Sequence, residues 1–143
     1  MTQEELKHLD YIQSAISRLA ANQFQIKGWS ITVDTALLTF FANSLSKGNG
    51  ANPYFLLSAL LPTLLFWILD SKFLSNERRL RQIYMDVIER KGNIQLFHMP
   101  LRQYQGAKFS MHSCMFSYAN ILVYPIVMGC FFAAFLGCMI FLS

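Results

Sequence analysis

The chain has 143 residues, of which 54% are hydrophobic and only 14% are charged, and its formal net charge is +4. A typical soluble domain has about 25% charged residues, so this composition argues against a soluble enzyme or binding domain and favours a membrane protein. The length allows a few membrane-spanning helices and little beyond them. In such a protein the excess of basic residues reports membrane orientation before it reports nucleic-acid binding.

Residues 1–26 are predicted to form a cytoplasmic amphipathic helix. Thr2 precedes Glu5 by three residues, which is the spacing of an N-terminal capping box. Apolar residues then recur at intervals of three and four, as in the seam of a helix bundle: Leu9, Ile12, Ile16 and Leu19. The seam packs either on the same chain or on a second copy, and the pattern leaves both open.

Residues 27–46 are predicted to form the first transmembrane helix. Small and hydroxyl side chains recur along one face of it: Gly28, Thr32, Thr35, Thr39, Ala42 and Ser46. Asp34 lies inside this apolar run. An ionisable group in the hydrocarbon region is a functional-site hypothesis by default, because it is costly to keep there.

Two interpretations of Asp34 are open. In one, Lys27, Lys72 or helix-end donors neutralise it as a structural ion pair. In the other, it lines a water-filled path in an oligomer, where a ring of acids favours cations. The pore-lining candidates are then Gly28, Thr32, Asp34, Thr35 and Thr39. At the shared level of the first two spans we expect a cluster of Lys27, Trp29, Asp34, Trp67, Asp70 and Lys72.

The second span is predicted at residues 53–71, after a turn-rich external loop at 47–52. Pro53 suits the first turn of a helix, whereas Pro62 falls in the middle and is expected to kink it. Residues 72–117 are expected in the cytoplasm, first as a helical extension of the second span that stops near Lys91. The remainder is a basic loop with no clear period.

Residues 118–143 are predicted to form the third span, which contains no charged residue. Gly129, Ala133 and Gly137 recur every four residues, the spacing that lets membrane helices approach closely, within or between chains. The three cysteines have no CxxC spacing and are interpreted as small apolar residues.

Basic residues predict the orientation. Three lie before or at the start of the first span, one lies in the 47–52 loop, and eight lie between the second and third spans: Lys72, Arg78, Arg79, Arg81, Arg90, Lys91, Arg102 and Lys108. The positive-inside rule therefore places the N-terminus and residues 72–117 in the cytoplasm and the C-terminus outside. The predicted fold is an all-α membrane protein with three transmembrane helices.

The basic residues of the loop have two interpretations. They contact lipid headgroups and set the topology, or they bind an anionic ligand such as a nucleotide or short single-stranded DNA. The ligand-binding candidates are Arg78, Arg79, Arg81, Lys91, Arg102 and Lys108. No catalytic motif occurs, and His8, His98 and His112 lack metal-ligand spacing, so we expect neither an enzyme nor a cofactor or metal.

A longer pattern resembles a family of small bacterial membrane proteins. It comprises His8, Ile12, Gln13, Ile16, Arg18, Ala20, Asn22, Phe24, Lys27, Gly28 and Trp29, and then Phe66-Trp67-Ile68-Leu69-Asp70 with Glu77, Arg78 and Tyr84. These residues span about Lys7 to Asp86; Asp34 and the third span are outside the pattern.

The resemblance implies a multi-pass protein of the bacterial inner membrane that acts in anti-phage defence, beside a nucleotidyltransferase partner. It implies the ion-channel effector of a Hailong-like system, controlled by a nucleotide or oligonucleotide at the cytoplasmic side. Because three spans are few to enclose a path, the channel reading requires a homo-oligomer. The alternative is a non-conducting membrane anchor or adaptor that recruits a cytoplasmic partner. The absence of an internal repeat disfavours a transporter.

Overall fold

The fold is described by a computed structural model, which covers residues 2–46, 52–89 and 97–142. Three long helices dominate it: α1 (Gln3–Ser46), α2 (Tyr54–Ile88) and α5 (Tyr124–Leu142). Between α2 and α5 lie a 3-10 turn, η1 (Ala107–Phe109), and two short helices, α3 (Met111–Met115) and α4 (Tyr118–Ile121). No strand occurs in the described ranges, so the prediction of an all-helical chain is confirmed for them.

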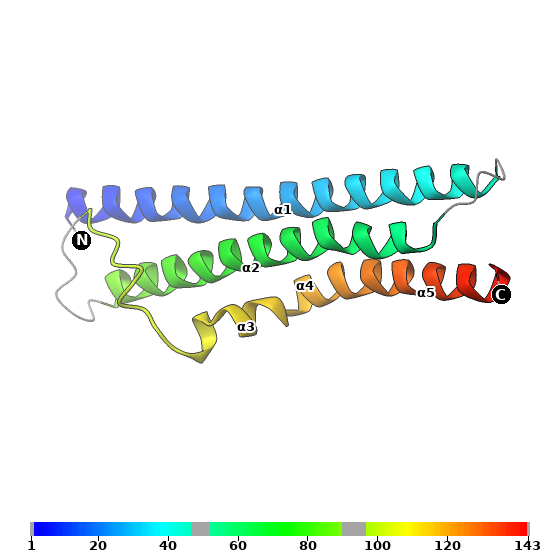
Figure 1. The fold of residues 1–143 in the computed structure, drawn as a ribbon. Helices are drawn as coiled ribbons and strands as arrows, with labels where there is room; N and C mark the ends of the chain where they lie inside the picture. The colour runs from blue at the N-terminus through cyan, green and yellow to red at the C-terminus, as the bar shows by residue number, and fades with distance from the viewer. Residues whose placement is uncertain (1, 47–51, 90–96, 143) are drawn as a thin grey trace.

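The three long helices run side by side with their axes nearly parallel, as Figure 1 shows. α1 extends the full length of the bundle, α2 returns antiparallel to it, and α5 packs mainly on α2. The chain begins at the end of the bundle where α2 stops, and α5 ends at the opposite end. Residues on α1 and α2 that share a level are therefore far apart in sequence.

The N-terminal signals of the helices are confirmed. The Thr2 hydroxyl accepts a hydrogen bond from the Glu5 amide at 3.2 Å, and the Glu5 carboxylate accepts one from the Thr2 amide at 2.8 Å. This reciprocal capping box starts α1, which continues through Gly28 without a break. Pro53 is the N-cap of α2, and Pro62 lies inside that continuous helix.

The predicted third span is divided. α4 ends at Ile121, and a turn at Leu122 and Val123 separates it from α5. Pro125 explains the break, because it has no backbone N–H to bond to Ile121 and restricts the residue before it. The predicted extension of the second span is confirmed to Ile88, whereas the expected stop at Lys91 lies outside the described residues.

Two apolar clusters hold the helices together, one toward each end of the bundle. The first contains Ile12 and Ile16 of α1 with Leu80 and Ile83 of α2. The seam of α1 thus packs on its own chain. The second contains Phe41, Leu56, Ala59 and Phe131, which join α1, α2 and α5.

Two segments are long and apolar enough to cross a membrane, Tyr54–Ile88 and Tyr118–Ile140. In the most apolar stretches of these two segments, only 33% and 11% of the residues, respectively, are buried within the single chain. Residues 27–46, the first of the three predicted spans, form the C-terminal part of α1 and include the charged side chains of Lys27 and Asp34. The count of three spans and the orientation remain predictions.

Candidate functional site

A series of buried polar side chains lies along the interface of α1 and α2. Three of them are acids, Asp34, Asp70 and Glu77, each less than 10% exposed. Each one contacts a polar residue of the facing helix, and the contacts follow the antiparallel register. A buried acid is costly unless it is paired or hydrogen-bonded, so these contacts fix how the two helices align.

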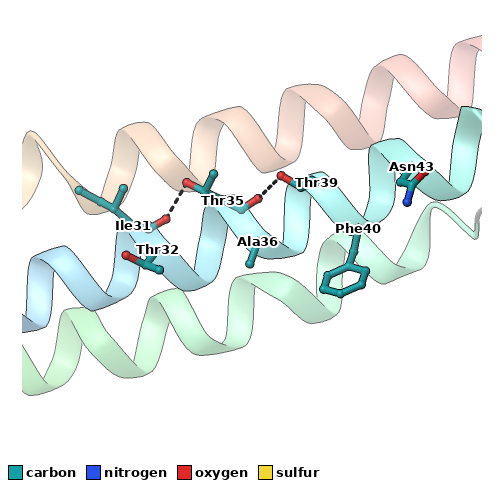
Figure 2. A pocket seen from close by; sticks show the side chains of 7 residues that line it. All are labelled: Ile31, Thr32, Thr35, Ala36, Thr39, Phe40 and Asn43. Atoms are coloured by element: carbon teal, nitrogen blue, oxygen red, sulfur yellow. Dashed lines mark hydrogen bonds between the residues drawn. The ribbon is translucent and has the colours of Figure 1, made fainter.

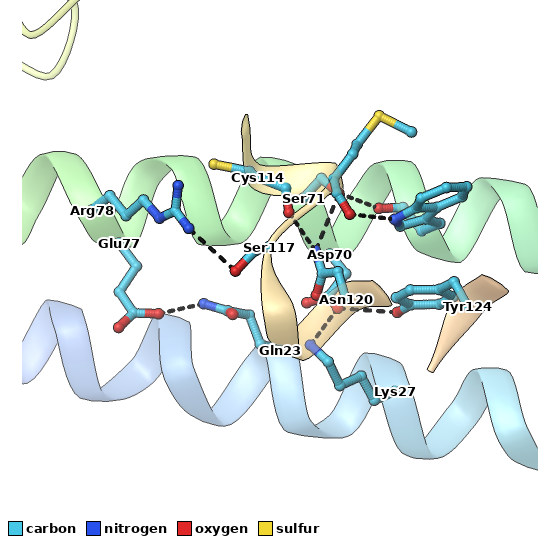
Figure 3. A network of polar contacts seen from close by, with 12 residues as sticks. Gln23, Lys27, Asp70, Ser71, Glu77, Arg78, Cys114, Ser117, Asn120 and Tyr124 are labelled. Carbon is cyan, nitrogen blue, oxygen red and sulfur yellow. Dashed lines mark hydrogen bonds and ion pairs between the residues drawn. The ribbon is translucent and has the colours of Figure 1, made fainter. Parts of the chain in front are cut away.

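The central contact is an ion pair between Lys27 of α1 and Asp70 of α2. The Asp70 side chain is fully buried, and the same oxygen that meets Lys27 accepts a hydrogen bond from the Tyr124 hydroxyl at 3.1 Å. The Tyr124 ring in turn stacks on Trp67, with 6.1 Å between ring centroids. One carboxylate therefore joins α1, α2 and α5, as Figure 3 shows.

Asp34 lies two turns further along α1 and has different partners. Its carboxylate accepts hydrogen bonds from Ser30 at 3.1 Å and from Thr63 of α2 at 2.8 Å. The sequence-based pairing of Asp34 with Lys27 is therefore wrong in its partner, because Lys27 pairs with Asp70. Lys72, the other proposed partner, is exposed.

Glu77 forms the third contact, at the end of the series nearer the N-terminus of α1. Its carboxylate accepts a hydrogen bond from the side-chain amide of Gln23. It also forms an ion pair with Arg81, which lies one turn further along α2. Because Arg81 is mostly exposed, this pair is at the edge of the interface and contributes little alone.

The two short helices α3 and α4 close one side of the series. The Asn120 amide nitrogen donates to the Ser71 hydroxyl at 3.3 Å and to the Cys114 carbonyl at 3.0 Å, and the Trp67 indole donates to the Met115 carbonyl at 3.1 Å. Asn120 is fully buried. Its side-chain oxygen, like the Oδ1 atom of Asp70, has no hydrogen-bond partner among the described residues.

The small and hydroxyl face of α1 points away from this series. Gly28, Thr32, Thr35 and Thr39 are all exposed. Each threonine hydroxyl donates to the carbonyl one turn earlier, at 2.7 to 2.8 Å, and Figure 2 shows two of these bonds. Asp34 is buried on another face, so the structure separates it from the other four pore-lining candidates. Three of those four, Thr32, Thr35 and Thr39, line a surface hollow of about 560 Å³ together with Phe40 and Asn43.

The ligand-binding candidates also divide into groups. The Arg78 guanidinium donates to the Lys108 carbonyl at 3.1 Å and to the hydroxyls of Ser113 and Ser117 at 3.2 Å. It therefore holds the 3-10 turn and α3 against α2. Arg81 pairs with Glu77, the Lys108 side chain is exposed, and Lys91 lies outside the described residues.

Arg79 and Arg102 line an open groove of about 590 Å³ between α2 and the segment at 98–103. Its other polar side chains are Asn76, His98 and Gln103. The Nε atom of Arg79 is buried and has no partner among the described residues. Two guanidinium groups with spare donors make this groove the part of the basic segment best suited to an anion.

The loop that forms the groove is tied to the helices at two points. The Tyr104 hydroxyl donates to Asp86 at 2.7 Å, and burial together with this carboxylate raises the pKa of Tyr104 to about 12. At the other end, the Phe97 amide donates to His8 at 3.1 Å. Burial lowers the pKa of His8, which favours the neutral ring that can accept this bond.

The predicted packing residues of the third span are exposed in the single chain. Nothing of the structure approaches the positions where Gly129 and Gly137 would carry a Cβ atom, and Ala133 is also exposed. They make no close helix contact within the described chain. The prediction of close packing within one chain is therefore not met for these residues, and close packing between chains stays a prediction.

In the described residues no group of three His, Cys, Asp or Glu side chains converges as a metal site would require.

Sequence reasoning missed several residues of the polar series: Gln23, Ser30, Thr63, Ser71, Asn120 and Tyr124. A partial signal existed for Asn120, an amide inside the uncharged third segment. From the expected cluster at the level of the first two spans, Lys27, Trp67 and Asp70 do come together, whereas Trp29 and Lys72 are exposed.

Comparisons with known proteins give no relative. No protein-family model, curated protein or solved structure matches the chain.

Replacing Lys27 tests the ion pair. Lys27→Met leaves the Asp70 carboxylate buried without its charge partner, which typically costs about 3–5 kcal/mol. The expected result is a thermal unfolding midpoint several degrees lower in detergent, with part of the loss recovered in Lys27→Met/Asp70→Asn. Lys72→Met, the matched exposed control, is expected to leave the midpoint unchanged. Equal midpoints for the two methionine variants would contradict the assignment.

Proposed function

We propose that the chain is the subunit of a homo-oligomeric ion channel in the bacterial inner membrane. Its three spans are residues 27–46, 53–71 and 118–143, with the N-terminus and residues 72–117 in the cytoplasm. The observation that carries the proposal is the hydroxyl face of α1, which the chain's own helices leave uncovered at the level of the two apolar segments.

The exposed apolar surface supports the membrane part of the proposal. Large apolar side chains project from α2 and α5 on the outside of the bundle, among them Leu61, Leu65, Ile126, Phe132 and Ile140. Soluble monomers rarely expose contiguous apolar patches above a few hundred Å², whereas lipid covers such a surface without cost.

The position of α1 supports counting its residues 27–46 as a span beside the two apolar segments. Its residues Leu37, Leu38 and Phe41 pack on the apolar cluster formed with α2 and α5, so this part of α1 lies at the same depth as both apolar segments. Asp34 is buried against Thr63, and Lys27 pairs with Asp70. The two charged side chains that lower the hydropathy of residues 27–46 are therefore turned toward protein and are largely shielded from lipid.

The pore follows from what remains uncovered. The threonine hydroxyls are satisfied by backbone carbonyls, yet each oxygen keeps acceptor capacity toward water or a cation. Copies arranged with this face of α1 toward a common axis enclose a path lined by Thr32, Thr35 and Thr39. The exposed Gly129, Ala133 and Gly137 face of α5 offers a neighbouring copy a surface for close approach.

Control by an anionic ligand is assigned to the groove of Arg79 and Arg102. Its volume of about 590 Å³ suits a nucleotide-sized ligand, and its guanidinium groups suit phosphate. Arg78 and Arg81, also candidates, already have protein partners. The placement in anti-phage defence, with a nucleotidyltransferase that supplies the ligand, rests on the residue pattern from His8 to Tyr84 alone.

Ion flux through the purified protein tests the channel. In planar bilayers we expect stepwise currents, and Thr35→Phe is expected to reduce conductance at least about tenfold, because an aromatic ring narrows a path of this kind. Leu65→Phe places the same ring on the exposed face of α2 and is expected to leave conductance unchanged. The absence of any current would favour the alternative, a non-conducting anchor or adaptor. Equal conductance in both variants would move the pore away from α1.

Ligand control is tested separately. Arg79→Glu combined with Arg102→Glu is expected to weaken binding of a fluorescent trinucleotide at least about tenfold, because each charge-assisted hydrogen bond contributes about 1.5–3 kcal/mol. Arg18→Glu combined with Lys72→Glu, which reverses two exposed basic side chains that do not line the groove, is the control for net charge. Similar losses in the two proteins would show that only general electrostatic attraction is at work.

A further inference from the structure

We infer that each subunit contains a water-filled half-path of its own, which enters from the side of the bundle at Glu77, where Arg81 is exposed, and stops at Asp34. The inference rests on the membrane embedding proposed above but not on the pore along α1. It concerns the interior of one subunit, between α1, α2 and α4, and its ligand is water together with the protons or small cations that water carries.

The buried side chains change character along the interface. Glu77, Asp70 and Thr63 are spaced by seven residues on α2, so the polar series is about 20 Å long at about 1.5 Å per residue. One turn beyond Thr63 the buried side chains become apolar, beginning with Ala59 and Leu56. Beyond Glu77 the buried side chains are apolar again, at Leu80 and Ile83, so the polar series reaches the surface sideways, at the exposed Arg81 that pairs with Glu77, and is closed beyond Asp34.

The charges in the series do not balance in a dry interior. Lys27 compensates Asp70, and Arg81 compensates Glu77 at the edge. Asp34 has only the hydroxyls of Ser30 and Thr63 as hydrogen-bond partners in the described chain. An ionised carboxylate without a counter-charge is very costly in a dry apolar medium, and water that reaches it removes most of that cost.

Two further atoms point to water. Asp70 Oδ1 and Asn120 Oδ1 are fully buried hydrogen-bond acceptors with no donor among the described residues. Their side chains are neighbours in the network, because Asn120 bonds Ser71, the residue after Asp70, and Tyr124, one turn after Asn120, bonds Asp70 itself (Figure 3). Water supplies two donors and satisfies acceptors of this kind. A cation would add net charge where Lys27 already neutralises Asp70.

The apolar cluster then acts as the barrier at the closed end. Phe41, Leu56, Ala59 and Phe131 are each less than 10% exposed and leave no polar group for water to follow. Hydrophobic constrictions of this kind block conduction by excluding water. Protons can therefore reach Asp34 from the Glu77 end and go no further while this packing holds.

Cysteine accessibility tests the half-path. Thr63→Cys and Ala59→Cys place thiols at two buried positions one turn apart on α2, in a background in which Cys114, Cys130 and Cys138 are replaced with alanine. Ag⁺ is the probe, because it is a thiol-reactive cation close in size to K⁺, and the unreacted thiols are counted with a fluorescent maleimide after denaturation. We expect position 63 to react at least tenfold faster than position 59 in proteoliposomes.

A second pair on α1, Ser30→Cys and Phe41→Cys, repeats the comparison should the first pair or the cysteine-free background fold poorly, and can be made with only Cys130 and Cys138 replaced. Equally slow reaction at both positions of a pair would overturn the inference in favour of a dry cluster. Equally fast reaction would overturn the closed end. Neither readout depends on ion current, so it fails or holds independently of the channel proposal.

Discussion

The buried ion pair between Lys27 and Asp70 is the interaction on which the rest of the structure depends. It sets the register of α1 against α2, and Tyr124 extends it to α5. A buried pair contributes little net stability compared with apolar packing, but losing either partner is expensive. Its main effect is therefore to exclude other alignments of three long helices whose apolar surfaces alone would tolerate sliding.

The same register gives α1 two different surfaces. Within residues 27–46, α1 turns its two ionisable side chains, Lys27 and Asp34, toward α2, and it turns threonines and Gly28 toward the outside. A helix that hides its charge and exposes hydroxyl groups can stand in a membrane beside lipid or beside water. This is the physical basis of two parts of the proposal, that residues 27–46 span the membrane and that a path follows their outer face.

Local features were predictable from the sequence because their causes are local. The Thr2 and Glu5 capping box, Pro53 at the start of α2 and the continuation of α2 past Asp70 needed no tertiary information. The break before Tyr124 also has a local cause in Pro125, and it was missed because the apolar composition of the segment outweighed that one residue.

Pairings could not be predicted, since they depend on the register between helices. Lys27 and Asp34 share a helical face by spacing, yet Lys27 reaches across to Asp70. Successive residues of a helix are about 100° apart around its axis, so Asp34 and Thr35 point in different directions. Helical geometry alone therefore argues against one pore lining that contains both. The role of Arg78 as a tie to Lys108 and Ser117 required the path of the following segment.

The most direct test of the central claim is to measure whether the outer face of α1 contacts water or lipid in a bilayer. Spin labels at position 35 and at position 65 are compared for collision with a water-soluble nickel complex and with oxygen, which concentrates in lipid. If α1 lines a water-filled path, the label at 35 responds to nickel while the label at 65, on the exposed face of α2, responds to oxygen. A label at 35 that responds to oxygen alone, as the label at 65 does, would contradict the account.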